Sequence, residues 1–233
     1  MNNKFPLEKL ERAIGYEFAD KGLILSALTH SSFVNELLIN KRPDYQRQEF
    51  LGDAVLELTV SDYLYRNYPE MKEGQLTHLR ASIVCEPTLA FCAASFGLSD
   101  YIIVGKGEDA AGLRYHESVI SDVFEAIIGA IYLDSGIENA SKFIFKFVLT
   151  DLDQKKLFFD AKSELLIWVQ REKGSLRYEL VSQTGPDNNR TYYIDAYVNG
   201  EKVSTGSGSS KKNAEQKAAY EALKVLRGLG RIS

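Results

Sequence analysis

The chain has 233 residues, of which 45% are hydrophobic and 26% charged, and its formal net charge at pH 7 is −4. This length allows one large domain or two smaller ones, and the composition is that of an ordinary globular protein. No apolar run reaches the roughly 20 residues that span a bilayer, and no signal peptide is evident. Cys85 and Cys92 are the only cysteines, and their spacing fits neither a disulfide framework nor a zinc site. We expect a cytoplasmic protein with no membrane partner.

The charge is distributed unevenly along the chain. Residues 1–153 contain 14 Lys and Arg against 23 Asp and Glu, a net charge of −9. Residues 154–233 contain 14 against 9, a net charge of +5. This asymmetry suggests an acidic body joined to a basic module, although many basic segments bind nothing.

Helical periodicity dominates the acidic part of the chain. Leu7, Leu10 and Ile14 share one face of a first predicted helix, and Asp20 can cap a second helix that follows it. Between Gly, Pro and Asp residues, further helices are predicted at residues 48–67, 74–84, 88–96, 117–133 and 138–149. The pattern predicts an all-helical domain.

Two of these predicted helices carry pairs of acids beside apolar residues. Glu49 and Asp53 are four residues apart, and Asp122 and Glu125 are three apart, so each pair lies on one helix face. Unpaired acids near a core are costly, and carboxylate ligands suit Mg²⁺ or Mn²⁺. Four acids from two helices could hold one or two ions, as in enzymes that hydrolyse phosphodiesters. A solvated acidic face is the alternative, and spacing alone does not decide between them.

The basic part of the chain has a different pattern. After a charged bridge at residues 151–156, a helix is predicted at 163–173. Alternating apolar residues predict three strands, with Asn199 and Gly200 forming a two-residue hairpin turn between the last two. A flexible loop at 206–210 then leads into a final helix, whose predicted buried stripe is Ala214, Ala218, Ala222 and Val225. The predicted order is α-β-β-β-α.

Both parts of the chain resemble one family, the bacterial ribonuclease III enzymes. The segments QEFLGDAVL (48–56), EGQLTHLRASIV (73–84) and SDVFEAIIGAIYLD (121–134) have that family's order and spacing. The segment SGSSKKNAEQKAAYEAL (207–223) is similar to a double-stranded RNA-binding domain. The resemblance implies an all-α N-terminal endonuclease domain at 1–153, a linker at 154–160, and a small α+β double-stranded RNA-binding domain at 161–229.

The resemblance also implies an activity. Family enzymes are Mg²⁺-dependent endoribonucleases, for which Mn²⁺ can substitute, and they cut double-stranded RNA to leave 5′-phosphate and 3′-hydroxyl ends with short 3′ overhangs. By motif position, Glu49, Asp122 and Glu125 resemble the metal ligands, while Asp53 and Glu125 resemble the residues closest to hydrolysis. Glu73 resembles a further acidic position, or is a solvated loop residue. The expected substrates are rRNA and mRNA precursors.

Family members are homodimers that pair through their nuclease domains. Phe50 is the residue expected to insert into the partner subunit, and an ordinary core phenylalanine is the alternative. Gly52 is expected to permit close helix packing. The family usually has a glutamate where this chain has Gln46, so any contribution of that acid is in doubt.

The RNA-binding module departs further from the family pattern. Leu166 and Ile167 replace the Gln-Glu pair that usually faces the minor groove, and Asn188 replaces a histidine. The start of the last helix keeps the expected phosphate contacts. The residues expected to bind RNA are therefore Asn188, Lys211, Lys212 and Gln216, with weakened groove contact at Leu166 and Ile167.

Other candidates carry less weight. His30 and His78 lack a metal-ligand partner in the sequence, so structural hydrogen bonding is expected, and Trp168 is expected in the core. Gly105 to Glu108 lacks the flanking features of a phosphate-binding loop. A non-catalytic double-stranded RNA-binding or ribosome-assembly protein on the same scaffold is the alternative function. Such a protein would be expected to lose the inner carboxylates, all four of which are present.

Overall fold

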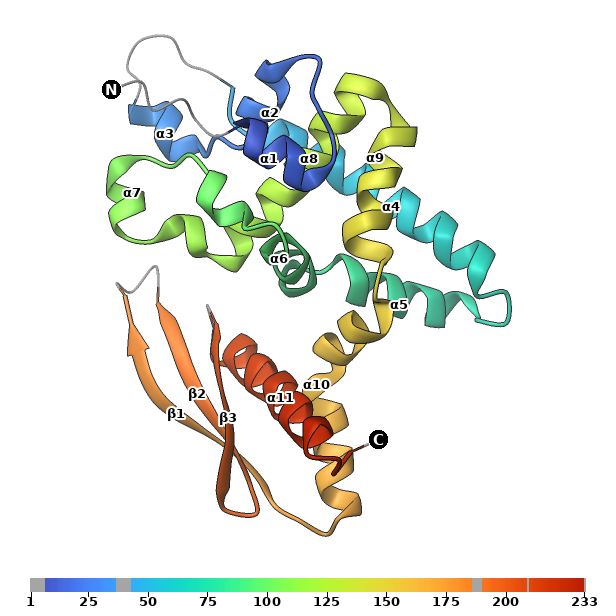
Figure 1. Cartoon of the computed structure of the whole chain (residues 1–233), viewed down its shortest axis with the longest axis vertical. Helices are drawn as coiled ribbons and strands as arrows, with labels where there is room; N and C mark the ends of the chain where they lie inside the picture. The colour runs from blue at the N-terminus through green and yellow to red at the C-terminus, as the bar shows by residue number, and fades with distance from the viewer. Residues whose placement is uncertain (1–6, 37–42, 186–189, 209, 233) are drawn as a thin grey trace. The chain divides into compact units, whose positions relative to one another are not determined.

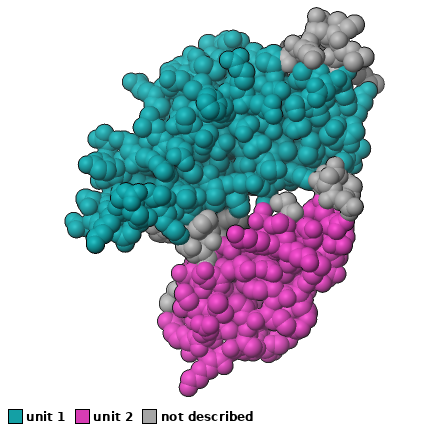
Figure 2. Space-filling model, turned by 180° about the vertical axis from the view of Figure 1, so that it is seen from behind, with its two compact units in different colours: residues 1–152 teal, residues 153–233 magenta. Residues whose placement is uncertain are grey.

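The structure, a computed structural model, describes residues 7–36, 43–185, 190–208 and 210–232, with the backbone only for 153–160. The chain divides into two compact units, Met1–Leu152 and Asp153–Ser233, which Figure 2 colours separately. No helix in the described part of the chain combines the length and the apolar character needed to cross a membrane. Each unit is described by itself below.

The first unit is helical (Figure 1). Its described elements are α1 (Leu7–Ile14), α2 (Lys21–Ala27), α3 (Ser31–Glu36), α4 (Gln46–Asn67), α5 (Glu73–Val84), α6 (Glu86–Ala94), η1 (Leu98–Tyr101), α7 (Lys106–Ala110), η2 (Leu113–Tyr115), α8 (Glu117–Ser135), α9 (Ile137–Ile144) and η3 (Phe145–Leu149). An isolated bridge joins Thr29 to Ile103. Asp20 caps α2 as predicted, because its carboxylate accepts a 2.7 Å hydrogen bond from the Gly22 amide.

Helices α4 and α8 form the centre of this unit and touch through their backbones. A Cβ atom placed on Gly52 of α4 would lie 1.8 Å from the carbonyl oxygen of Glu125 on α8. A Cβ on Gly129 of α8 would lie 2.2 Å from the carbonyl oxygen of Gln48. Only glycine fits at either position, so the predicted role of Gly52 in close packing is confirmed.

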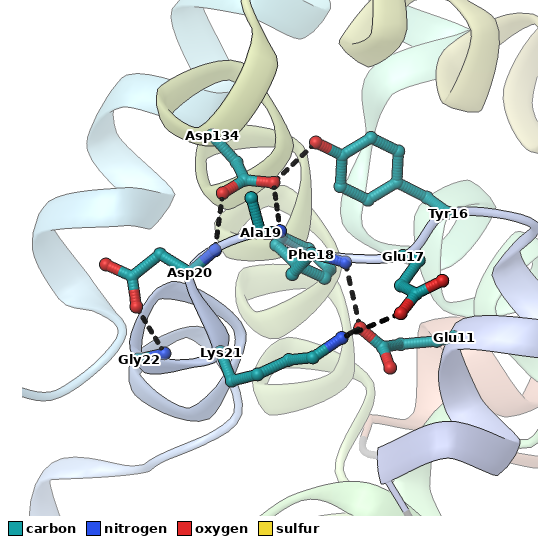
Figure 3. A network of polar contacts seen from close by, with 9 residues as sticks. All are labelled: Glu11, Tyr16, Glu17, Phe18, Ala19, Asp20, Lys21, Gly22 and Asp134. Carbon is teal, nitrogen blue, oxygen red and sulfur yellow. Dashed lines mark hydrogen bonds and ion pairs between the residues drawn. The ribbon is translucent and has the colours of Figure 1, made fainter.

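The C-terminal end of α8 is fastened to the loop between α1 and α2 (Figure 3). The carboxylate of Asp134 accepts hydrogen bonds from the Ala19 and Asp20 amides, both 2.9 Å, and from the Tyr16 hydroxyl at 2.6 Å. Burial alone would raise the pKa of Asp134, but these donors outweigh it and lower that pKa. Asp134 is therefore a structural anchor for one end of the helix.

The second unit is a three-stranded antiparallel sheet with two helices on one face (Figure 1). Its elements are α10 (Leu152–Arg171), β1 (Leu176–Thr184), β2 (Thr191–Val198), β3 (Glu201–Gly208) and α11 (Lys211–Gly228), with strand order β1-β2-β3. Asn199 and Gly200 both have positive φ, 54° and 83°, as a tight hairpin turn requires. The fold class predicted from the sequence, an all-α domain plus an α-β-β-β-α domain, is confirmed.

Three local predictions were wrong. Strand β3 continues through Gly208, where a flexible loop was predicted, because its glycines allow close approach to α11: a Cβ on Gly206 would lie 2.2 Å from the Ala218 nitrogen. Val225 is 43% exposed, and the buried stripe continues to Leu226 instead. Helix α10 begins at Leu152, well before the predicted start at residue 163, so the charged bridge is largely helical.

Candidate active site and RNA-binding surface

The contact between α4 and α8 brings the two predicted acid pairs to adjacent helix faces. Gly52 lies between Glu49 and Asp53 in the sequence, and it packs on the backbone of Glu125 itself. Asp122 lies one turn before Glu125 on α8. Glu49, Asp122 and Glu125 are partly buried, whereas Asp53 is exposed. The glycine contact therefore explains how acids at least 69 residues apart in the sequence become neighbours.

Each of these carboxylates lies in the electrostatic field of the others. Burial, followed by the negative charges of Asp53, Asp122 and Glu49, raises the pKa of Glu125 to about 8. Burial, followed by the charges of Asp122 and Asp53, raises the pKa of Glu49 to about 7. The pKa of Asp122 is also raised by burial, against the opposing effect of a hydrogen bond from Tyr45. The site therefore holds an excess of closely spaced negative charge.

The donor set fits a hard divalent cation. Carboxylate oxygens are the ligands that Mg²⁺ and Mn²⁺ prefer. A cation would compensate both the burial and the like-charge repulsion that raise the pKa values of Glu49 and Glu125. The side chains do not already form a ligand cluster, since no three His, Cys, Asp or Glu residues in the described ranges could hold an ion as they stand. To share an ion, these carboxylates would therefore have to move closer together than they are in this structure.

Two residues near the acids were missed by sequence reasoning. The Tyr45 hydroxyl donates a 3.1 Å hydrogen bond to Oδ2 of Asp122, across 77 positions of sequence, so no local pattern could have revealed it. Glu86, at the start of α6, has a pKa raised by burial and then by the charge of Asp122. His30, by contrast, makes a structural hydrogen bond as predicted: its Nδ1 accepts from the Ser32 amide at 3.0 Å.

Three large hydrophobic side chains of α4 are exposed to solvent. Phe50 is 81% exposed, which rules out an ordinary core position within this chain, and Leu58 and Tyr65 are exposed on the same face. Beside them, α4 and α5 enclose a hollow of about 600 Å³. It is lined by Leu58, Ser61, Asp62, Leu64, Tyr65, Met71, Glu73, Leu76, Thr77 and Arg80.

In the second unit, the predicted phosphate contacts lie at the start of α11. Lys211 and Lys212 are exposed in its first turn, directly after Ser210, whose hydroxyl caps the helix by accepting from the Asn213 amide at 3.1 Å. Gln216 is partly buried one turn further on. Leu166 and Ile167 are exposed on α10, while Asn188 lies outside the described residues.

Fold and site together define a helical nuclease-type domain with a cluster of coupled acids, followed by a domain of the double-stranded RNA-binding type. The sequence model of the Ribonuclease-III-like family matches residues 20–152, and that of the double-stranded RNA binding motif matches residues 161–226. The chain belongs to the ribonuclease III family, as the motifs indicated. As a member of that family it is an endoribonuclease that acts on double-stranded RNA.

Individual relatives agree with this assignment. Ribonuclease 3 of Listeria innocua serovar 6a is 44% identical over 222 residues, which is 94% of this chain and 97% of that protein. Ribonuclease 3 of Geobacillus kaustophilus is 44% identical over 223 residues, 94% of this chain and 91% of that protein. The nuclease domain of ribonuclease III from Campylobacter jejuni superposes with a TM-score of 0.57 at 42% identity, covering 61% of this chain and 95% of that one.

Proposed function

We propose that the chain hydrolyses double-stranded RNA with Mg²⁺ bound by Glu49, Asp122 and Glu125. The observation that carries this assignment is the packing of Gly52 on the backbone of Glu125, which places the acids of α4 beside those of α8. Mn²⁺ would substitute, because it prefers the same oxygen ligands. The products would carry 5′-phosphate and 3′-hydroxyl ends with short 3′ overhangs, as in the family.

We assign metal binding and proton transfer to these residues according to their exposure to solvent. When bound, a divalent ion supplies the positive charge that polarises the scissile phosphate and makes a water nucleophilic. Glu49, Asp122 and Glu125 would hold that ion from the partly buried side of the site. Asp53 is exposed, so its carboxylate can reach a water on the substrate side and accept its proton. Glu125, whose pKa is raised by burial and by the charge of Asp53, would act with Asp53 in the hydrolytic step.

A cleavage assay with and without divalent metal tests this function. Incubated with Mg²⁺, the protein should convert a labelled RNA duplex to short double-stranded fragments, and excess EDTA should stop the reaction while duplex binding persists. A single-stranded RNA of the same sequence serves as the control and should stay intact. Binding without cleavage in Mg²⁺ and in Mn²⁺ would instead favour the non-catalytic alternative.

We further propose that Lys211 and Lys212, with Gln216 and Asn188, contact the RNA. The positive end of the helix dipole and the exposed lysines both favour phosphate at this end of α11. Replacing both lysines by alanine should weaken binding to every duplex sequence by about 10-fold and reduce the slope of log affinity against log salt by about 2. The measurement is a salt titration of duplex affinity.

The matched control for this pair lies on the same helix. Lys224 and Arg227 are exposed near the other end of α11, so changing both to alanine removes the same charge without touching the proposed surface. If the two double variants have the same salt slope, the effect is one of net charge and the assignment of Lys211 and Lys212 is wrong.

We propose a homodimer that forms through the nuclease domain, with Phe50 inserted into the partner. A region of the Campylobacter jejuni nuclease domain is described as involved in dimer formation, and exposed large hydrophobic side chains such as Phe50, Leu58 and Tyr65 on one helix are typical of an interface. Phe50→Glu should convert the full chain to a monomer in sedimentation velocity. Tyr115→Glu, which alters another exposed aromatic residue of the same domain, should remain dimeric; dissociation of both variants would argue against a specific role for Phe50.

The remaining assignments concern context. We propose residues 1–153 as the nuclease domain, 154–160 as the linker and 161–229 as the RNA-binding domain, which agrees with the two compact units and the matched ranges. By analogy with the family, the substrates are rRNA and mRNA precursors in the cytoplasm. Sequencing of RNA ends that depend on the protein would test the substrate assignment.

A further inference from the structure

Tyr45 connects both acid-bearing helices through a single residue. Its ring is buried, with 5% of the residue exposed, and its hydroxyl donates to Oδ2 of Asp122 on α8 at 3.1 Å. Its carbonyl oxygen accepts hydrogen bonds from the amides of Gln48 and Glu49, both at 2.9 Å, and so begins α4. One end of this residue therefore contacts Asp122, and the other contacts the backbone of Glu49.

The position of Tyr45 is itself fixed by its surroundings. Its amide donates to the Thr29 carbonyl at 3.0 Å, next to the bridge between Thr29 and Ile103. The ring of His30 packs on the tyrosine ring with 5.6 Å between centroids. The His30 ring is in turn held by Ser32, through the 3.0 Å bond from the Ser32 amide. These contacts fix the position of the phenol ring. The hydroxyl of Tyr45 therefore sets the orientation of the Asp122 carboxylate, and not the reverse.

This arrangement constrains which oxygen of Asp122 is available to a ligand. A hydrogen bond to Oδ2 limits the rotation of the carboxylate, so Oδ1 is the oxygen that remains for a ligand. Partners of this kind orient the ligands of metal sites, and their loss typically lowers metal affinity 10- to 100-fold. We propose that Tyr45 is a positioning residue of the acidic centre, which holds Asp122 in the orientation that binds a divalent cation. This inference rests on the metal site proposed above.

The test is the affinity of the full chain for Mn²⁺, measured by electron paramagnetic resonance of the free ion. Tyr45→Phe keeps the buried ring and removes only the hydroxyl. It should weaken Mn²⁺ binding by about 10-fold or more, and RNA cleavage should recover when Mn²⁺ is raised to saturation. A structural role alone would lower the melting temperature without this recovery.

Tyr16→Phe is the matched control. It also removes a phenol that donates to an aspartate of α8, but that aspartate is Asp134, at the opposite end of the helix from Asp122 (Figure 3). Its Mn²⁺ affinity should equal that of the wild type, although its stability should fall. Unchanged Mn²⁺ binding by Tyr45→Phe, or equal weakening in both variants, would overturn the role of Tyr45. Failure of the wild-type chain to bind Mn²⁺ would overturn the metal site itself, a result that the variants do not mimic.

Discussion

Replacing Glu125 by glutamine is expected to abolish cleavage of double-stranded RNA while leaving duplex binding intact. Glutamine keeps the size and shape of the side chain, so the packing of α8 is preserved, but it removes the carboxylate. Glu125 is the acid whose pKa is raised furthest, to about 8, first by burial and then by Asp53, Asp122 and Glu49. If Glu125 holds the metal and takes part in proton transfer, as proposed above, its loss should lower the single-turnover rate by about 10³-fold or more.

Two measurements separate catalysis from binding in this variant. Single-turnover cleavage in Mg²⁺ gives the rate, and a gel shift with the same duplex in EDTA gives the affinity. Glu138→Gln, which changes an exposed glutamate of α9, should cleave at the wild-type rate. Normal turnover by the Glu125 variant would remove this residue from the active site, and a parallel loss of RNA affinity would indicate a binding role instead.

The sequence predicted which residues form the acidic centre but not how they meet. Helical spacing alone places Glu49 beside Asp53, and Asp122 beside Glu125, because these relations are local. The meeting of the two pairs depends on Gly52 and Gly129, which contact backbone atoms of the opposite helix. The motif resemblance drew attention to Gly52. Gly129 had no such signal, since a glycine in an apolar helix is compatible with many kinds of packing.

The same limit explains the errors in the second unit. The turn at Asn199 and Gly200 was predictable because positive φ at adjacent residues has a local signature. Gly206 was misread as a flexible loop residue, because the sequence does not distinguish a glycine needed for conformational freedom from one needed for close approach to α11. The hydrogen bond between Tyr45 and Asp122 could not be predicted either, because it joins residues 77 positions apart and has no local sequence pattern.

Replacing Gly52 by alanine is expected to be the most disruptive single change in the nuclease domain. The new methyl carbon would lie 1.8 Å from the Glu125 oxygen, 2.7 Å from its carbonyl carbon and 2.9 Å from the Gly129 nitrogen. All three are rigid backbone atoms, so the helices must separate. Helix α8 cannot simply move away, because Val123, Phe124 and Ile127 are fully buried on its other sides and a close-packed interior opens voids when it shifts.

Overpacking of this kind should lower the free energy of unfolding by about 3 kcal/mol or more, measured by urea denaturation of the full chain. Gly74→Ala is the control: a Cβ there meets nothing within 4 Å, and in the first turn of α5 alanine should be neutral or slightly stabilising.

Where the Gly52 variant still folds, separation of α4 from α8 should also move Glu49 and Asp53 away from Asp122 and Glu125. Cleavage should therefore fall more than the folded fraction does. A Gly52 variant with wild-type stability and activity would mean that the helices do not touch at this point, and the convergence of the four acids would then need another explanation.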